Sequence, residues 1–214
     1  MGNRREFLLG GVTGAAAVAV AGLPAVDAWT AERAPLPQRA PRAAPLYRLI
    51  VDERFTVAHG LLAAARDHGV ASSVIDGDVT DVWFNDLDLR WRQGPAPIAG
   101  LTTVGALFCL ERLAWDAGMR LHFRADHRCF ADGRVEHVLR APASVVTRAD
   151  ALRLAHPDWA RALLPLLTRG TAAPAGVLSE RIVIGAPGSF PAGHSEWLVS
   201  WYIGPKAARR GGTA

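Results

Sequence analysis

Several acidic and hydroxyl side chains in this 214-residue chain come directly after short apolar runs, where the ends of strands would place them. In an open α/β sheet, ligands bind beyond the carboxyl ends of the strands, so these side chains predict a binding edge. The turn at 100–103 could present free backbone N–H groups and hydroxyls to an anionic group. The alternative is that its threonines only cap a helix. The candidate ligand-binding residues are Asp52, Glu53, Asp76, Asp78, Gly100, Thr102 and Thr103.

A second candidate site lies on a predicted hairpin around Asp132 and Gly133. If these two residues form the turn, Cys129 lies opposite Glu136, and His127 lies on the same side. Nitrogen, sulfur and oxygen ligands together suit zinc or copper. Because a shift of one residue in register moves side chains to the other face, the alternative is that the histidine and cysteine simply pack there.

Motifs for other cofactors are missing from the sequence. Two cysteines, Cys109 and Cys129, are too few for an iron–sulfur cluster, and neither a Cys-x-x-Cys-His haem motif nor a G-x-G-x-x-G dinucleotide motif occurs. No cofactor is therefore evident, apart from the possible metal. The two cysteines either form a disulfide bond or remain as buried free thiols, and the sequence leaves both open.

The first 28 residues contain two adjacent arginines before a weakly apolar run. Arg4 and Arg5 are followed by Phe7 and Leu8, then by a run rich in glycine and alanine that ends in small residues at Ala28. This segment resembles a twin-arginine (Tat) signal peptide, cut after Ala28. The resemblance implies recognition by the Tat translocase and a periplasmic or extracellular location. Since the run is only weakly hydrophobic, we expect cleavage and no stable membrane span; a retained anchor is the alternative.

Proteins with Tat signals cross the membrane already folded, either with an inserted cofactor or together with a partner. Because cofactor motifs are missing, the resemblance favours a non-catalytic accessory or binding subunit that supports an exported redox enzyme. The rival hypothesis is a small exported hydrolase or metal-dependent enzyme with its site at the strand carboxyl ends.

The composition limits the expected partners of the chain and indicates its domain boundaries. The net charge is only +4, and no basic run is interleaved with aromatic residues, so nucleic acid is not an expected partner. Residues 29–45 are rich in proline, alanine and arginine and predict an extended linker, and residues 206–214 predict a disordered tail. The remaining residues, 46–205, are enough for one domain with a substantial core.

Periodicity indicates the elements that must position these side chains. Apolar runs at 46–51 and 71–75 flank a helical pattern at 55–65, which predicts a βαβ unit with parallel strands. Residues 76–100 should form an ordered connecting segment that packs over the sheet. A helix should run from a cap at Thr102 or Thr103 to Ala117 and be buried nearly all round.

The second half predicts a hairpin of strands at 119–125 and 134–139, two short helices between 147 and 167, and strands at 181–185 and 196–203. Trp197 and Trp201 should share one side of the last strand, where they either pack in the core or bind a partner. The predicted fold class is thus α/β: a single domain with a mixed sheet built on an N-terminal βαβ unit, with a C-terminal strand pair.

Overall fold

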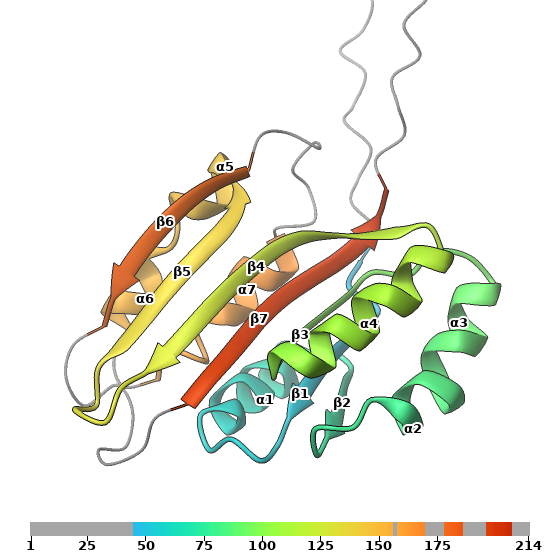
Figure 1. Ribbon diagram of the computed structural model, residues 1–214, viewed down its shortest axis with the longest axis horizontal. Helices are drawn as coiled ribbons and strands as arrows, with labels where there is room; N and C mark the ends of the chain where they lie inside the picture. Colours follow the sequence, from blue (N-terminus) through green and yellow to red (C-terminus); the bar gives the residue numbers. More distant parts are fainter. Residues whose placement is uncertain (1–44, 156–157, 170–177, 186–195, 207–214) are drawn as a thin grey trace, which may run out of the picture. The chain divides into compact units, whose positions relative to one another are not determined.

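A seven-stranded mixed sheet organises the protein in the computed structural model, which describes residues 45–155, 158–169, 178–185 and 196–206 (Figure 1). The residues of the predicted export signal, Arg4, Arg5, Phe7, Leu8 and Ala28, lie outside these ranges, as do the predicted linker up to residue 44 and the predicted tail from residue 207. The strands are β1 (Arg48–Asp52), β2 (Ser72–Ile75), β3 (Ile98–Thr102), β4 (Met119–Cys129), β5 (Val135–Pro142), β6 (Leu178–Ile184) and β7 (Glu196–Pro205). Their order across the sheet is β2-β1-β3-β7-β4-β5-β6.

The predicted βαβ unit is confirmed. Helix α1 (Ala58–Asp67) connects β1 to β2, and β1 pairs in parallel with both β2 and β3. Leu61 and Ala65 recur at helical spacing and are fully buried, while Gly69 follows the helix with a φ of 65°. The other strand pairs are antiparallel, so the sheet is mixed as predicted.

Helices cover the two faces of the sheet unequally (Figure 1). One face packs against α1, α5 (Ala143–Val146), α6 (Asp150–Leu154) and α7 (Leu163–Arg169). The other packs against α2 (Thr80–Val82), the π-helical turn η1 (Trp83–Leu87), α3 (Asp88–Arg92) and α4 (Val104–Asp116). Within the described residues, no helix combines the length and the apolar character needed to cross a bilayer.

Helix α4 is less buried than the sequence predicts. Thr103 caps it, as expected, by accepting a hydrogen bond from the Ala106 backbone N–H at 3.3 Å. However, Phe108 is 58% exposed and Trp115 is 41% exposed, because α4 packs on the sheet with one side only. Cys109 is also exposed on this helix; both cysteines are free thiols, and only Cys129 is buried.

The last two strands enter the sheet at different places. Strand β7 inserts between β3 and β4, whereas β6 pairs with β5 and forms the edge of the sheet. They are therefore both present and both antiparallel to their neighbours, but they do not pair with each other. This arrangement puts β7 at the centre of the sheet, where Leu198, Val199, Trp201 and Ile203 are completely buried.

Candidate interaction surface

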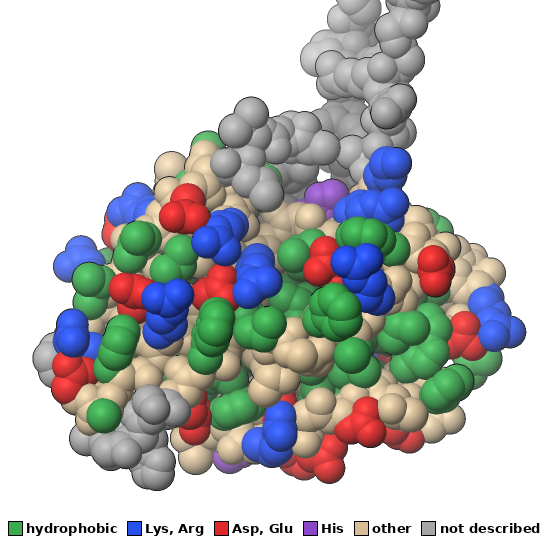
Figure 2. Space-filling view, in the orientation of Figure 1, with side chains coloured by type: hydrophobic (Ala, Val, Ile, Leu, Met, Phe, Trp, Pro, Cys, Tyr) green, Lys and Arg blue, Asp and Glu red, His purple; other side chains and the backbone are tan. Residues whose placement is uncertain are grey.

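One half of the sheet has an uncovered side. Strands β4, β5 and β6 pack against helices on one face. On the opposite face α4 covers the start of β4, around Met119 and Leu121, and no described helix covers the rest of β4 or strands β5 and β6; we call this uncovered area the open face (Figures 1 and 2). Successive side chains of a strand alternate between the two faces, so the open face takes every second residue. It consists of Arg124, Asp126, Arg128, Glu136, Val138, Arg140, Glu180, Ile182, Ile184 and Trp197.

Asp126 is the centre of a polar network on the open face. Asp126 as a whole residue is only 5% exposed. It accepts hydrogen bonds from Arg124 Nη2 at 2.7 Å, Arg124 Nε at 3.1 Å and the indole N–H of Trp197 at 3.2 Å. Arg140 Nη1 lies 3.6 Å from the same carboxylate, and Arg140 Nε donates to Glu180 at 2.8 Å.

This network has two effects. The hydrogen bond with Asp126 raises the pKa of Arg124 and fixes the position of its guanidinium. The hydrogen bond between Trp197 and Asp126 also fixes one edge of a large indole ring. Because hydrogen bonds already hold these side chains in the free protein, the side chains would lose less conformational entropy when a partner binds.

Large apolar side chains lie around this network. Ile182 is 58% exposed, Ile184 is 53% exposed and Trp197 is 52% exposed. The Arg128 guanidinium lies 5.6 Å from the centre of the Trp197 ring. Tryptophan and arginine are the residues that most often dominate protein interfaces. Figure 2 shows hydrophobic and charged side chains interspersed on this side of the molecule.

The exposed side of α4 extends this surface. Helix α4 packs beside the open face, and the charge of Glu111 on α4 contributes to the raised pKa of Arg124. The Arg112 guanidinium lies 4.0 Å from the Trp115 ring centre and 5.4 Å from that of Phe108. The stacking of arginine on exposed aromatic rings therefore occurs on both neighbouring elements.

The predicted ligand-binding edge is assembled, and several of its residues have partners within the protein. Since β2, β1 and β3 are adjacent and parallel, their carboxyl ends meet. Asp52 is fully buried and accepts hydrogen bonds from Arg54 Nε at 2.9 Å and Nη2 at 2.7 Å. Asp78 accepts hydrogen bonds from the backbone N–H of Thr80 at 2.9 Å and from its hydroxyl at 2.7 Å, and these bonds lower the pKa of Asp78.

The other residues of this edge differ in their surroundings. The hydroxyl of Thr102 accepts a hydrogen bond from the Trp201 indole at 3.0 Å, and a Cβ on Gly100 would lie 2.3 Å from the backbone oxygen of Ile50. Glu53 and Asp76 are exposed. Thr102 and Gly100 thus help to pack β3 against its neighbours. The role of the edge in binding a ligand stays a prediction.

The predicted metal-ligand set is not brought together. Strands β4 and β5 pair Cys129 with Val135 and His127 with His137, so Glu136 points to the open face while His127 and Cys129 point away from it. The predicted register was wrong by one residue, because the turn contains three residues and ends at Gly133 with a φ of 81°. No group of three or more metal-binding side chains occurs within the part of the chain that the structure describes.

The correct register creates a buried polar cluster that the sequence reasoning missed. His127 Nδ1 lies 2.7 Å from His137 Nδ1, and His127 Nε2 lies 2.8 Å from the Ser200 hydroxyl. The Trp159 ring centre lies 4.7 Å and 4.9 Å from those of the two histidines. Burial lowers the pKa of His137 to about 4, and burial together with the charge of His137 lowers that of His127 well below 6.5. Only the hairpin register could have revealed this pair.

The order Ser200, His127, His137 is that of a nucleophile, a base and an orienting group. However, all three side chains are completely buried, so no substrate can reach the hydroxyl in this structure. Ser200 also lies in the middle of β7, between β3 and β4, where the strand ladders use the backbone N–H groups that would stabilise an oxyanion. The cluster is therefore a polar element of the core.

Comparisons of the chain with protein-family models, with curated proteins and with solved structures found no match.

Proposed function

We propose that this protein is an exported, non-catalytic accessory subunit that binds an exported enzyme, and that this partner covers the open face. The observation that carries this proposal is the combination of Trp197, Ile182 and Ile184 exposed beside an ordered arginine–carboxylate network. A sheet normally buries an apolar face against another layer. A partner would supply that layer here.

The charges of the open face support a protein partner over a nucleic acid. Three arginines, Arg124, Arg128 and Arg140, are balanced by three carboxylates, Asp126, Glu136 and Glu180. Arg128 and Glu136 approach to 3.5 Å, and Arg140 pairs with Glu180. Since the face has no net charge, it favours recognition by apolar contacts and shape. Binding to phosphates would need an excess of positive charge.

The N-terminal resemblance supports the location and the kind of partner. A Tat signal sends a folded protein across the membrane, so an apolar face is already formed when the protein crosses. A partner that crosses on the same signal would cover the face from the start. An exported redox enzyme, whose cofactor is inserted before export, is the class that fits this route.

Affinity purification of the exported full-length product tests the proposal. We expect a stoichiometric partner to be recovered with the wild-type protein, and the variants Trp197→Ala and Ile182→Asp to weaken its binding by about tenfold or more, as substitutions at the centre of an interface do. Phe84→Ala is the matched control, because Phe84 is 62% exposed but lies on η1, outside the open face. Each variant should keep its unfolding temperature within a few degrees.

Two results would contradict the proposal. If the wild-type protein is recovered as a lone monomer, the proposed partner does not exist. The double variant Arg4→Lys with Arg5→Lys lacks the paired guanidinium groups of the predicted signal. If its export is undiminished, the proposed Tat route and exported location are wrong.

A further inference from the structure

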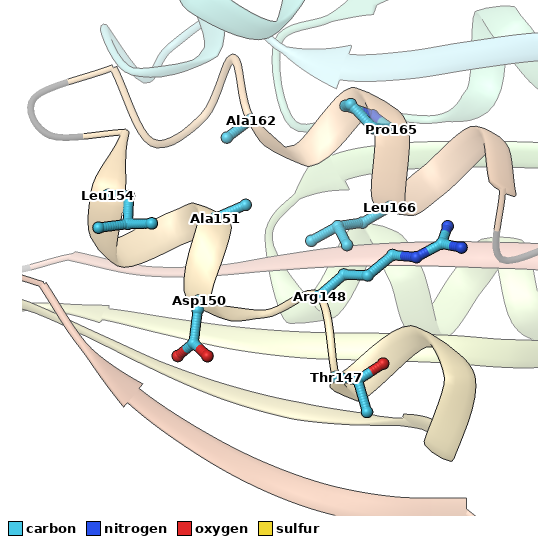
Figure 3. A pocket seen from close by; sticks show the side chains of 8 residues that line it. All are labelled: Thr147, Arg148, Asp150, Ala151, Leu154, Ala162, Pro165 and Leu166. Atoms are coloured by element: carbon cyan, nitrogen blue, oxygen red, sulfur yellow. The ribbon is translucent and has the colours of Figure 1, made fainter.

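A groove lies between α6 and α7, on the side of the sheet opposite to the open face (Figure 3). Its volume is about 450 Å³, which is within the range of sites for small molecules. Among the residues that line it are Thr147, Arg148, Asp150, Ala151, Leu154 and Leu166.

The walls of the groove are apolar. Ala151 from α6 and Leu166 from α7 point toward each other across it, as Figure 3 shows. Leu154 lies at one end and is 74% exposed, the highest exposure among the large hydrophobic side chains of the described residues. An exposed apolar groove of this kind leaves surface that a ligand could remove from water.

The charged groups of the groove are not equivalent. Both carboxylate oxygens of Asp150 lie 2.7 Å from Arg181 Nη2, so this charge is neutralised by an ion pair. The hydroxyl of Thr147 donates to the Ser144 carbonyl at 3.2 Å. By contrast, the guanidinium of Arg148 has no hydrogen bond or ion pair with any of the described residues. One unpaired cation thus lies at the Thr147 end of an apolar groove, away from Leu154 (Figure 3).

From this arrangement we infer that the groove binds a single-chain anionic amphiphile, for which a long-chain fatty acid is the simplest example. The acyl chain lies along Ala151, Leu154 and Leu166, and the carboxylate accepts hydrogen bonds from Arg148. The planar guanidinium presents two parallel N–H groups that match the two oxygens of a carboxylate. An extended peptide fits less well, because the apolar walls offer no partners for its backbone N–H and C=O groups.

Binding of dodecanoate and dodecanol to the full-length protein, measured by calorimetry below the concentration at which either aggregates, tests this inference. We expect saturable binding of one dodecanoate and at least tenfold weaker binding of dodecanol, which has the same chain but no charge. Arg148→Gln should weaken dodecanoate binding about tenfold and leave dodecanol binding unchanged. Arg153→Gln is the matched control, because Arg153 is an exposed arginine of α6 outside the groove.

Two substitutions on the groove wall complete the experiment. Ala151→Trp should fill the groove and abolish binding of both ligands. Leu154→Asp, at a position too exposed to disturb folding, should weaken dodecanoate at least as much as Arg148→Gln does. The inference is overturned if dodecanoate does not saturate, if dodecanol binds equally well, or if the Arg148 and Leu154 variants bind dodecanoate like the wild type. None of these results depends on the open face or its partner.

Discussion

Lowering the pH from 7.5 to 5.5 should destabilise the protein through the buried pair His127 and His137. In the folded state both imidazoles stay neutral, since burial lowers the pKa of His137 to about 4 and that of His127 well below 6.5. In the unfolded chain both groups titrate near 6.5. Below that pH the unfolded state binds protons that the folded state excludes. The stability is therefore complete above pH 6.5 and is lost progressively as the pH falls toward the folded-state values.

The size of the effect follows from this difference in proton binding. Each histidine that stays neutral in the folded state lowers the free energy of unfolding by about 1.4 kcal/mol per pH unit below 6.5. Between pH 7.5 and 5.5 the loss is on the order of 1 kcal/mol for each histidine and about 2–3 kcal/mol for the pair. A domain of this size has a total stability of about 5–15 kcal/mol, so the change is readily measured.

Urea unfolding, followed by tryptophan fluorescence at pH 7.5, 6.5 and 5.5, is the assay. His137→Phe should lose about half of the pH dependence, and the double variant His127→Phe with His137→Phe should lose nearly all of the contribution of the pair. His59→Gln is the control, because His59 is an exposed histidine outside the buried pair. The reasoning is refuted if the free energy of unfolding of the double variant falls between pH 7.5 and 5.5 as much as that of the wild type does.

Two further predictions concern backbone packing and thiol reactivity. Gly100→Ala should destabilise the protein by about 3 kcal/mol, since the added Cβ would lie 2.3 Å from the Ile50 oxygen and 2.5 Å from the Trp201 ring. A Cβ on Gly105 in α4 meets open space, so Gly105→Ala should stabilise the protein by up to about 1 kcal/mol. Thermal unfolding measures both, and an equal response at the two positions would contradict the close packing of β3. In the folded protein only Cys109 should react rapidly with a thiol reagent at pH 8, because Cys129 is buried and burial raises its pKa to about 12. A Cys109→Ser variant that still shows one rapid thiol would be inconsistent with this environment.

Local patterns predicted the elements of the fold well. The helical spacing of Leu61 and Ala65, followed by Gly69, predicted α1, and Thr103 capped α4 as expected. These features depend on residues only a few positions apart, so the sequence contains their physical cause. The helices α2 and α3 were not predicted, because residues 76–100 lack a sustained apolar period and are held by packing against the sheet.

The candidate site depended on features that no local pattern contains. The hairpin signal was correct, but a turn of three residues in place of two separated Glu136 from His127 and Cys129 and joined His127 to His137. Trp197 and Trp201 do share one side of β7, as their spacing predicted, yet one is half exposed and the other is completely buried. Their difference arises because α4 covers only part of that face.

The sequence by itself determined that these residues form an α/β domain with a parallel βαβ start, because strand and helix periodicities act over short stretches of chain. Only the tertiary structure decided that β7 lies between β3 and β4, that β6 forms an edge, and that β5, β6 and the C-terminal part of β4 keep one face uncovered. Such pairings join residues far apart in the sequence, and their stability comes from the burial of whole faces. The open face is thus a property of the assembled sheet.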